Sequence, residues 1–565
     1  MKRTIIILGA VIIAALCAVY ISTRGGNETV IVNPEYDTNG ADYFLLHKIE
    51  RTDTATVLYA GVYHLPNYWV LISDEIKLKD SKGKTYKLLR CDGFELDKEV
   101  FMPESGTMAF ALYFEPVDKD EKEVDIIDMD ENKKTITGVK LYNVKHNEPV
   151  RCVLKGEVIN RPQSSRIALL KSGEDFRAAK VTCIPILDGK FEYTLYADAE
   201  EAYQLIFYDE ILQASWYHVD FIAESGTCYF TLNSVDKRDN NSIRGSKYTE
   251  IYLSVGDSLR KQMQPLVKAL DDKMDKLYEE KKYYIPEVNV ILDKIDSLPT
   301  DAPQRRDLFE KLDELIGKGA GKTLEAKELD NEHFRIHKTM YVDKLVEYAK
   351  EHTDIVGYTL LVEMIRHAIL YSNNRLNVKP MFDIFHDLYE TKYPDHPYTA
   401  TIKSHIQSAA IAVGKPCPDI VLDDDKGNNV HLSELIKGKV ALVHLWASWC
   451  GPCRRHGKEM IPVYEMYKDK GFTVVSIARE QRKESMTAAV KQDGYPWTNF
   501  LELNDGNGIW TIFGVGNAGG GDFLVDAQGN FLAVKTSPKE MKEILQNMYQ
   551  PIDITPARTP GRGHR

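Results

Sequence analysis

The stretch Lys439-Val-Ala-Leu-Val-His-Leu-Trp-Ala-Ser-Trp-Cys-Gly-Pro-Cys453 decides the fold of the last quarter of this 565-residue chain. Its first part, 440–446, is a nearly continuous apolar run, which is typical of a strand that is buried on both faces. The segment from Arg454 to Lys468 has amphipathic spacing and predicts a helix. The sequence therefore predicts a strand, a tight turn and a helix, with two cysteines in the turn.

The turn places Cys450 at the N-terminus of the predicted helix. Unsatisfied N–H groups and the helix dipole stabilise a thiolate there, and such thiols have pKa values of roughly 3.5–7.5 instead of about 8.5. Gly451 permits the tight turn, and Pro452 presets the helical φ. Cys453 faces the same side and can resolve a mixed disulfide on Cys450. We interpret the pair as a redox-active dithiol; a purely structural pair is the alternative.

Residues 412–549 resemble the TlpA/ResA type of thioredoxin-like thiol–disulfide oxidoreductases. The resemblance is carried by the Trp-Cys-Gly-Pro-Cys motif together with four segments that match the family's order of strands. These are an opening strand, the active-site strand and turn, a further parallel strand and a C-terminal hairpin, at Gly414–Leu422, Val440–Cys453, Phe472–Ile477 and Phe523–Val534.

The resemblance implies a C-terminal α/β thioredoxin-like fold and disulfide exchange on client proteins. It also implies that Cys450 is the attacking thiol and Cys453 the resolving thiol. An upstream thiol would supply electrons, and no cofactor is expected beyond the redox-active disulfide. The predicted supporting residues are Trp449, Gly451, Pro452, His444, His456 and Gly520.

Three of these residues depart from the family pattern. Gly520 stands in place of a cis-proline, and a cis bond without proline costs roughly 2.5–4 kcal/mol. We therefore expect a trans or reshaped loop, with altered docking of client peptides. His444 replaces a buried acid or asparagine and is either a proton shuttle or a hydrogen-bonded core histidine. His456 replaces a glutamate, and a cation there would lower the thiol pKa.

The same dithiol supports a second hypothesis from a different class. Cys450, Cys453 and His456 form a Cys-x-x-Cys-x-x-His pattern, which could bind or deliver a soft metal such as Cu(I) or Zn. A peroxidase is disfavoured because its Pro-x-x-x-Thr/Ser-x-x-Cys setting is replaced by the sequence at 446–450.

The chain before residue 412 changes its periodicity twice. Alternating β-branched and aromatic residues at 55–63 and 107–114 predict strands, as does the segment 190–196 after an Asp-Gly turn. From about 249 the apolar period becomes 3.6, and we expect a kink or a restart at Pro265.

These patterns predict a multidomain chain in which two β-sandwich-like domains and an all-α region precede the thioredoxin-like domain. The predicted segments are a signal peptide or membrane anchor, a β domain, a second β domain, a helical domain, the thioredoxin-like domain and a disordered tail, at 1–25, 26–145, 146–248, 249–411, 412–550 and 551–565.

The N-terminus predicts export. Two cations precede an uncharged, mostly apolar run within residues 4–21, and the next charge is Arg24. This run is at the short end of what spans a bilayer and longer than most secretory segments. An uncleaved membrane anchor, cleavage near Ala15 to Cys17 and lipidation of Cys17 are all open. In each case the remainder would be periplasmic or in the cell envelope.

Composition excludes other classes of protein. The net charge of −12 argues against nucleic acid as a partner, because phosphate binding needs a basic face. Eight cysteines are too few for a disulfide-stapled scaffold. We interpret Cys91, Cys152, Cys183, Cys228 and Cys417 as buried small hydrophobes. A bridge between Cys183 and either Cys152 or Cys228 stays open.

Overall fold

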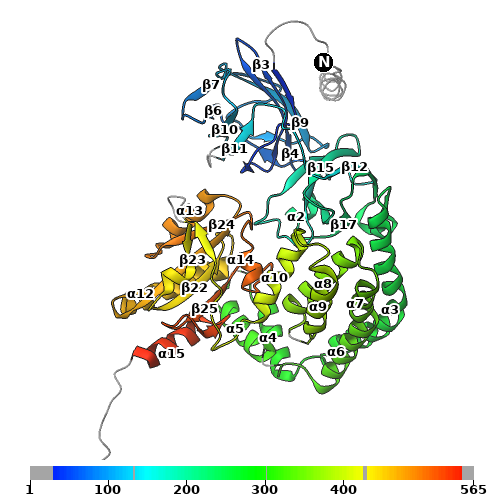
Figure 1. The fold of residues 1–565 in the computed structure, drawn as a ribbon, viewed down its shortest axis with the longest axis vertical. Coiled ribbons are helices and arrows are strands. Elements are labelled where there is room, and N and C mark those ends of the chain that lie inside the picture. Colours follow the sequence, from blue (N-terminus) through cyan, green and yellow to red (C-terminus); the bar gives the residue numbers. More distant parts are fainter. Residues whose placement is uncertain are drawn as a thin grey trace, which may run out of the picture.

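The computed structural model has four parts packed against one another (Figure 1). The residues that it describes are 29–130, 134–300, 302–317, 319–373, 375–423 and 429–549. We call the parts the first β domain, the second β domain, the helical domain and the C-terminal domain, whose elements span residues 29–140, 150–244, 247–409 and 421–549. The predicted multidomain fold class is confirmed.

The predictions for residues 1–25 and 551–565 lie outside the described residues. Among the helices that are described, none combines the length and the apolar character needed to cross a membrane.

The first β domain is built from strands alone, and nine of them form one antiparallel sheet. The strands are β1 (Thr29–Val32), β2 (Thr38–Asn39), β3 (Phe44–Arg51), β4 (Thr56–Tyr63), β5 (Trp69–Val70), β6 (Lys77–Asp80), β7 (Thr85–Asp92), β8 (Val100–Phe101), β9 (Thr107–Phe114), β10 (Glu123–Ile127) and β11 (Ile136–Lys140). The order is β1-β3-β4-β9-β7-β6-β10-β11-β2, and β5 pairs with β8 separately. Leu58 of β4 and Ile126 of β10, from the two halves of the sheet, lie in one core.

The second β domain is a sandwich of two four-stranded sheets. Its elements are β12 (Val150–Val158), β13 (Arg166–Lys171), β14 (Thr182–Pro185), β15 (Lys190–Ala197), β16 (Ala202–Phe207), α2 (Tyr208–Leu212), β17 (His218–Ile222), β18 (Gly226–Leu232), η1 (Val235–Asn240) and β19 (Ser242–Arg244). The sheets have the orders β15-β12-β18-β19 and β14-β13-β16-β17. Phe191 and Leu195 on one face of β15 pack with Phe221 of the other sheet.

The helical domain surrounds one buried helix. Its helices are α3 (Lys247–Glu279), α4 (Pro286–Ser297), α5 (Gln304–Gly317), α6 (Leu324–His337), α7 (Asp343–Glu351), α8 (Ile355–Leu370), α9 (Lys379–Ile384) and α10 (Pro397–Ala409), with π-helical turns η2 (Lys338–Val342) and η3 (Phe385–Tyr389). Most of α8 is buried, and α3, α7, α9 and α10 pack around it. The α3 helix continues through Pro265, so the restart expected there does not occur.

The C-terminal domain is a seven-stranded sheet with helices on both faces. Its elements are β20 (Val421–Asp423), β21 (Asn429–His431), α11 (Leu432–Ile436), β22 (Val440–Trp446), α12 (Gly451–Tyr467), η4 (Lys468–Lys470), β23 (Phe472–Glu480), α13 (Lys483–Asp493), β24 (Asn499–Leu503), α14 (Ile509–Ile512), β25 (Gly521–Val525), β26 (Phe531–Val534) and α15 (Pro538–Tyr549). The order is β21-β20-β24-β23-β22-β25-β26.

The strand predicted from its apolar run, β22, lies inside this sheet, between β23 and β25. It runs parallel to β23 and antiparallel to β25, and all seven of its residues are buried. Helices α12, α13 and α15 pack on one face of the sheet, and α11 and α14 lie on the other. The turn with the two cysteines therefore follows directly on a strand that is buried on both faces.

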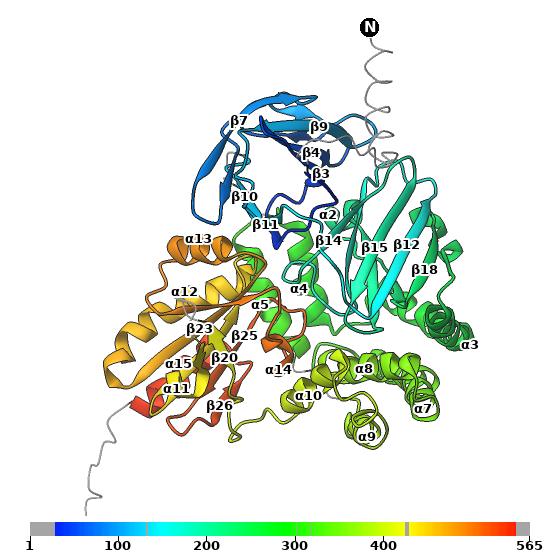
Figure 2. The same cartoon turned by 45° about the horizontal axis from the view of Figure 1, so that its top comes forward.

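The C-terminal domain contacts both the helical domain and the second β domain (Figure 2). Helix α14 packs on α10. The loop between β13 and β14 reaches the C-terminal domain, where the Gln481 side chain donates hydrogen bonds to the carbonyls of Phe176 and Ala179, each at 2.8 Å. The domain that carries the two cysteines is thus packed against two other domains.

We predict that Leu361→Ala destabilises the helical domain, because Leu361 is fully buried in α8. Leaving a cavity at such a site costs about 2–5 kcal/mol. Thermal unfolding followed by circular dichroism should show a lower midpoint. Leu266→Ala in α3 removes a side chain that is 48% exposed and should leave the midpoint nearly unchanged; equal shifts for both variants would contradict the proposed core.

Candidate functional site

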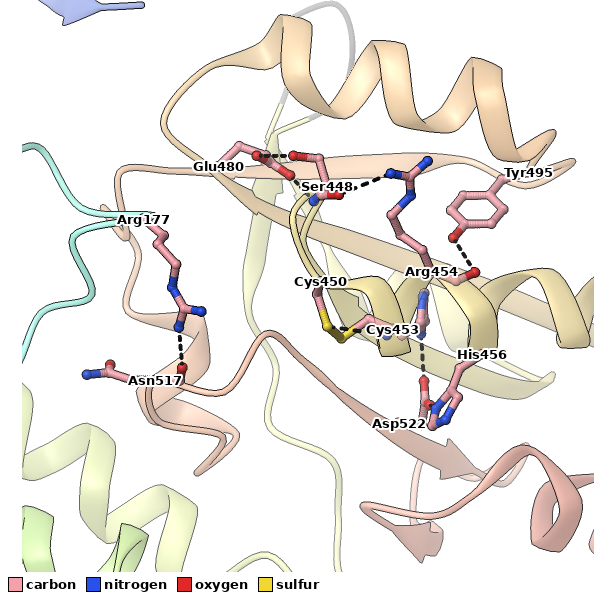
Figure 3. Close-up of a disulfide and its surroundings, with 11 residues drawn as sticks. Arg177, Ser448, Cys450, Cys453, Arg454, His456, Glu480, Tyr495, Asn517 and Asp522 are labelled. Carbon is pink, nitrogen blue, oxygen red and sulfur yellow. Dashed lines mark hydrogen bonds and ion pairs between the residues drawn. A yellow bond between two sulfur atoms is a disulfide. The ribbon is translucent and has the colours of Figure 1, made fainter. Parts of the chain in front are cut away.

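The two motif cysteines form a disulfide at the N-terminus of α12 (Figure 3). Cys450 is the N-cap of the helix, and its Sγ accepts a hydrogen bond from the Cys453 backbone N–H at 3.2 Å. Cys450 is only 9% exposed, whereas Gly451 and Pro452 of the turn are exposed. The structure therefore brings these motif residues together where a helix dipole acts on Cys450.

One carboxylate, that of Asp522, contacts both of the predicted histidines; Figure 3 labels it beside His456. His444 of β22 lies opposite Asp522 of β25 in the sheet, with Nδ1 2.6 Å from Oδ1. His456 of α12 places its Nδ1 3.2 Å from Oδ2 of the same carboxylate. His444 and Asp522 are buried, and His444 Nε2 has no hydrogen-bond partner among the described residues.

The charges in this group favour an ionised carboxylate. Burial alone would raise the pKa of Asp522, but the charge and hydrogen bonds of His444 and His456 hold it below its usual value. The hydrogen bond that His456 donates to Asp522 raises the pKa of His456 against the opposing effect of burial. His456 therefore keeps a proton to a higher pH than an exposed histidine does.

A second buried acid, Glu480, supports the turn from the end of β23. The Ser448 backbone N–H and hydroxyl both donate to its carboxylate, the hydroxyl at 2.9 Å. Burial raises the pKa of Glu480 to about 7 although these hydrogen bonds lower it. Glu480 thus changes its charge near neutral pH. Its hydrogen-bond partner Ser448 is two residues before Cys450 in the sequence.

Glycines close the other side of the disulfide. A Cβ on Gly519 would lie 2.4 Å from Cys450 Sγ, and a Cβ on Gly520 would lie 1.8 Å from the Leu445 carbonyl oxygen. The predicted residue Gly520 therefore backs onto β22, and its neighbour Gly519 is the one that faces Cys450. All peptide bonds of the described residues are trans.

The second β domain contributes Arg177 to the same site (Figure 3). Its guanidinium lies 4.0 Å from the centre of the Trp449 ring, and its Nη2 donates to the Asn517 carbonyl at 3.0 Å. Arg454, which directly follows Cys453 in the sequence, instead pairs with Asp493, with nitrogen–oxygen distances of 2.6 and 2.9 Å. Arg177 rather than Arg454 is therefore the arginine that covers the tryptophan.

Sequence reasoning missed Asp522, Glu480, Gly519 and Arg177. A signal existed for Asp522, a charged residue within an apolar strand directly after three glycines. Nothing local marks Glu480 as a partner of Ser448, and Arg177 is in a different domain. These contacts depend on how distant segments meet.

The other five cysteines of the described residues are free thiols. Cys152 and Cys228 are buried, and Cys91, Cys183 and Cys417 are partly buried, so neither bridge left open for Cys183 is formed. The described residues contain no group of three or more His, Cys, Asp and Glu side chains placed to hold a metal ion.

We predict that Glu480→Gln changes the pH dependence of stability. The ordinary glutamate pKa of 4.5 rises to about 7 on folding, so stability gained from the protonated form below 4.5 is lost as pH rises through about 7. The variant, which stays neutral, should gain in melting temperature relative to the parent at about pH 8 but not at about pH 5.

Glu484→Gln is the matched control, because Glu484 is exposed at the start of α13. A Glu480→Gln effect of the same size at both pH values would show that the carboxyl does not titrate in this range.

Three comparisons with known proteins concern this domain. The model of the AhpC/TSA family matches residues 413–532. The thiol-disulfide oxidoreductase ResA of Geobacillus kaustophilus is 26% identical over 27% of this chain and 84% of its own length. The thiol:disulfide interchange protein DsbE of Allochromatium vinosum is 29% identical over 25% of this chain and 75% of its own length.

A solved thioredoxin domain of a thiol-disulfide oxidoreductase from Bacteroides vulgatus is 27% identical over 25% of this chain and 100% of its own, with a TM-score of 0.23. The matched relatives cover only the last quarter of the chain, and the resemblance seen in the sequence is confirmed there. The C-terminal domain is a thioredoxin-like domain similar to the ResA and DsbE thiol–disulfide oxidoreductases.

Proposed function

We propose that this protein is an exported thiol–disulfide oxidoreductase that acts on disulfides of client proteins. The observation that carries the proposal is the Cys450–Cys453 disulfide at the N-terminus of α12, at the edge of a thioredoxin-like sheet. The names of the relatives that match this domain describe the same chemistry.

The reaction begins from the reduced dithiol. The Cys450 thiolate attacks one sulfur of a client disulfide, forms a mixed disulfide and releases the other client sulfur as a thiolate. The Cys453 thiolate then attacks Cys450 Sγ and releases the second client thiolate. Two electrons have passed to the client, and the disulfide seen in the structure is the oxidised product, which an upstream thiol must reduce again.

The buried His444 would manage the proton of the resolving step. Cys453 must lose a proton before it attacks, and His444 has an unpaired Nε2 to receive one. The Asp522 carboxylate, 2.6 Å from Nδ1, would stabilise the imidazolium that results. We assign Trp449, Gly451, Pro452 and Gly520 to the walls and turn of the site.

Export and tethering are proposals that rest on residues 4–21. An apolar segment behind two cations supports an anchor or a leader, and a periplasmic or cell-envelope location would expose the dithiol to secreted clients. We favour the reducing direction, because Gly-Pro between the cysteines resembles the reducing members of the family. The measurement that tests this direction is the reduction potential of the pair, which in this fold spans roughly −270 to −120 mV.

We predict that Cys450→Ser abolishes disulfide reduction and that Cys453→Ser accumulates a mixed disulfide. The first variant lacks the attacking thiol, and the second attacks without a resolving partner. Reduction of insulin in the presence of dithiothreitol measures the first effect, and a non-reducing gel detects the second. Cys417→Ser, a change at a free thiol outside the turn, serves as the control. Equal rates for Cys450→Ser and the parent would refute the proposed function.

We predict that Gly519→Ala impairs the same reaction. Its Cβ would meet Cys450 Sγ at 2.4 Å, so the loop or the sulfur must move, and a displacement of this order costs about 100-fold in rate. Gly521→Ala is the matched control in the same loop, because its Cβ meets only side-chain carbons at 3.5 Å and should change the rate by about twofold at most. Similar losses in both variants would show that general loop mobility, not contact with Cys450, is responsible.

A further inference from the structure

The loop that joins β13 to β14 in the second β domain is fixed against the loop between α14 and β25, which carries Gly519. Arg177 donates to the Asn517 carbonyl, and the Asn517 side chain donates in return to the Gly173 carbonyl at 3.4 Å. Asp175 holds the Arg177 guanidinium at 2.9 and 2.6 Å. Because Asp175 and the Asn517 carbonyl both bind the Arg177 guanidinium, its position beside Trp449 is fixed.

Aromatic rings continue from this contact across the second β domain. The Arg177 guanidinium lies between two tryptophans, 4.0 Å from the ring of Trp449 and 5.5 Å from that of Trp216. Phe176 packs edge-on against Trp216 with 5.4 Å between ring centres. Trp449, Arg177, Phe176 and Trp216 therefore form a continuous ridge, which we call the aromatic ridge and which begins at the residue before Cys450.

The far end of the aromatic ridge is open to solvent. Trp216 is 50% exposed and Tyr217 is 40% exposed, and every residue from 212 to 218 is exposed. In Figure 1 the preceding helix α2 lies on the side of its domain that faces the C-terminal domain. Trp216 fills no core and is linked to the reactive turn through Arg177 and Trp449, and an exposed tryptophan in such a place is typical of a binding surface.

The other wall of the site constrains what would bind. Gly519 presents only main chain to Cys450, so on that side a client segment would meet backbone and no side chain. Beyond Trp449 the surface that continues is the aromatic ridge. An apolar side chain a few residues from the reacting cysteine would meet Trp216.

We propose that the aromatic ridge is a docking surface for the polypeptide of the client, and that it selects segments with apolar side chains next to the disulfide. The inference rests on the proposed function and deepens it by naming the substrate class. The second β domain would then act in substrate recognition, through Trp216, as well as in holding the domains together.

The test uses the full chain and three disulfide probes. One is a synthetic peptide with an intramolecular disulfide flanked by phenylalanine and leucine, the second carries serines at those two places, and the third is hydroxyethyl disulfide. Trp216→Ala should lower the rate with the apolar peptide about tenfold relative to its rate with hydroxyethyl disulfide. The serine peptide should lose little of its already lower rate.

The matched control is Trp69→Ala, because Trp69 is 47% exposed on β5 of the first β domain. It should leave the ratio of peptide to hydroxyethyl disulfide rates unchanged. An unchanged ratio in Trp216→Ala, or equal losses with all three probes, would overturn the proposal. A faster reaction of the apolar peptide would also overturn it, since the aromatic ridge would then be covering the dithiol.

A binding measurement separates this proposal from the proposed function. Fluorescence anisotropy of the labelled apolar peptide with the Cys450→Ser variant needs no redox step, and adding Trp216→Ala should weaken binding about tenfold. If no probe is reduced by the parent chain but this binding loss is seen, the oxidoreductase proposal fails and the docking surface stands. If the peptide binds both variants equally, the docking surface fails whatever the redox result.

Discussion

The close approach of backbone to sulfur at Gly519 is the constraint on which the site depends. No side chain fits between Gly519 and Cys450 or between Gly520 and the Leu445 carbonyl, and a third glycine follows at 521. Glycine loses more conformational freedom on folding than any other residue. A loop of this composition does not hold its own shape, and its position must be fixed by contacts from outside.

Cationic side chains from three places supply those contacts. Lys535 donates to the Gly514 carbonyl at 2.6 Å, Arg479 to that of Gly516 at 3.2 Å and Arg177 to that of Asn517 at 3.0 Å. Charge-assisted hydrogen bonds are stronger than neutral ones. Arg479 and Arg177 are each paired with an aspartate, Asp505 and Asp175, so their guanidinium groups are held before they reach the loop. One of the three cations belongs to the second β domain, so the loop between α14 and β25 is held by two domains.

Local signals in the sequence were sufficient for the turn and for the layers around it. The apolar run at 440–446 is β22 and the alternation at 107–114 is β9, because each pattern reflects burial within a single element. Of the kink or restart expected at Pro265, the restart does not occur, because α3 is one helix from Lys247 to Glu279. Packing of α3 against α6, α7 and α8 accompanies a helix that continues through the proline.

Contacts between distant residues could not be predicted in the same way. Asp522 meets His444 only because β25 pairs with β22 in a register that places the two opposite each other. Arg177 meets Asn517 across 340 positions of sequence, and no periodic pattern carries that information. The sequence motif pointed to Gly520, whereas the glycine that faces Cys450 is its neighbour Gly519. An alignment of motifs does not resolve a difference of one residue.

The two histidines around Asp522 also define the pH range in which the buried group is most stabilising. The lowered pKa of Asp522 contributes stability above the ordinary aspartate value of 3.8, and this contribution is lost as pH falls through the lower folded value. The raised pKa of His456 contributes fully below the ordinary histidine value of 6.5 and is lost as pH rises through the higher folded value. Both contributions are therefore complete between these two ordinary values. A single acid in the place of His444 would bring a second negative charge next to Asp522, whereas a histidine can share its carboxylate, so the residue types of β22 and β25 are physically coupled.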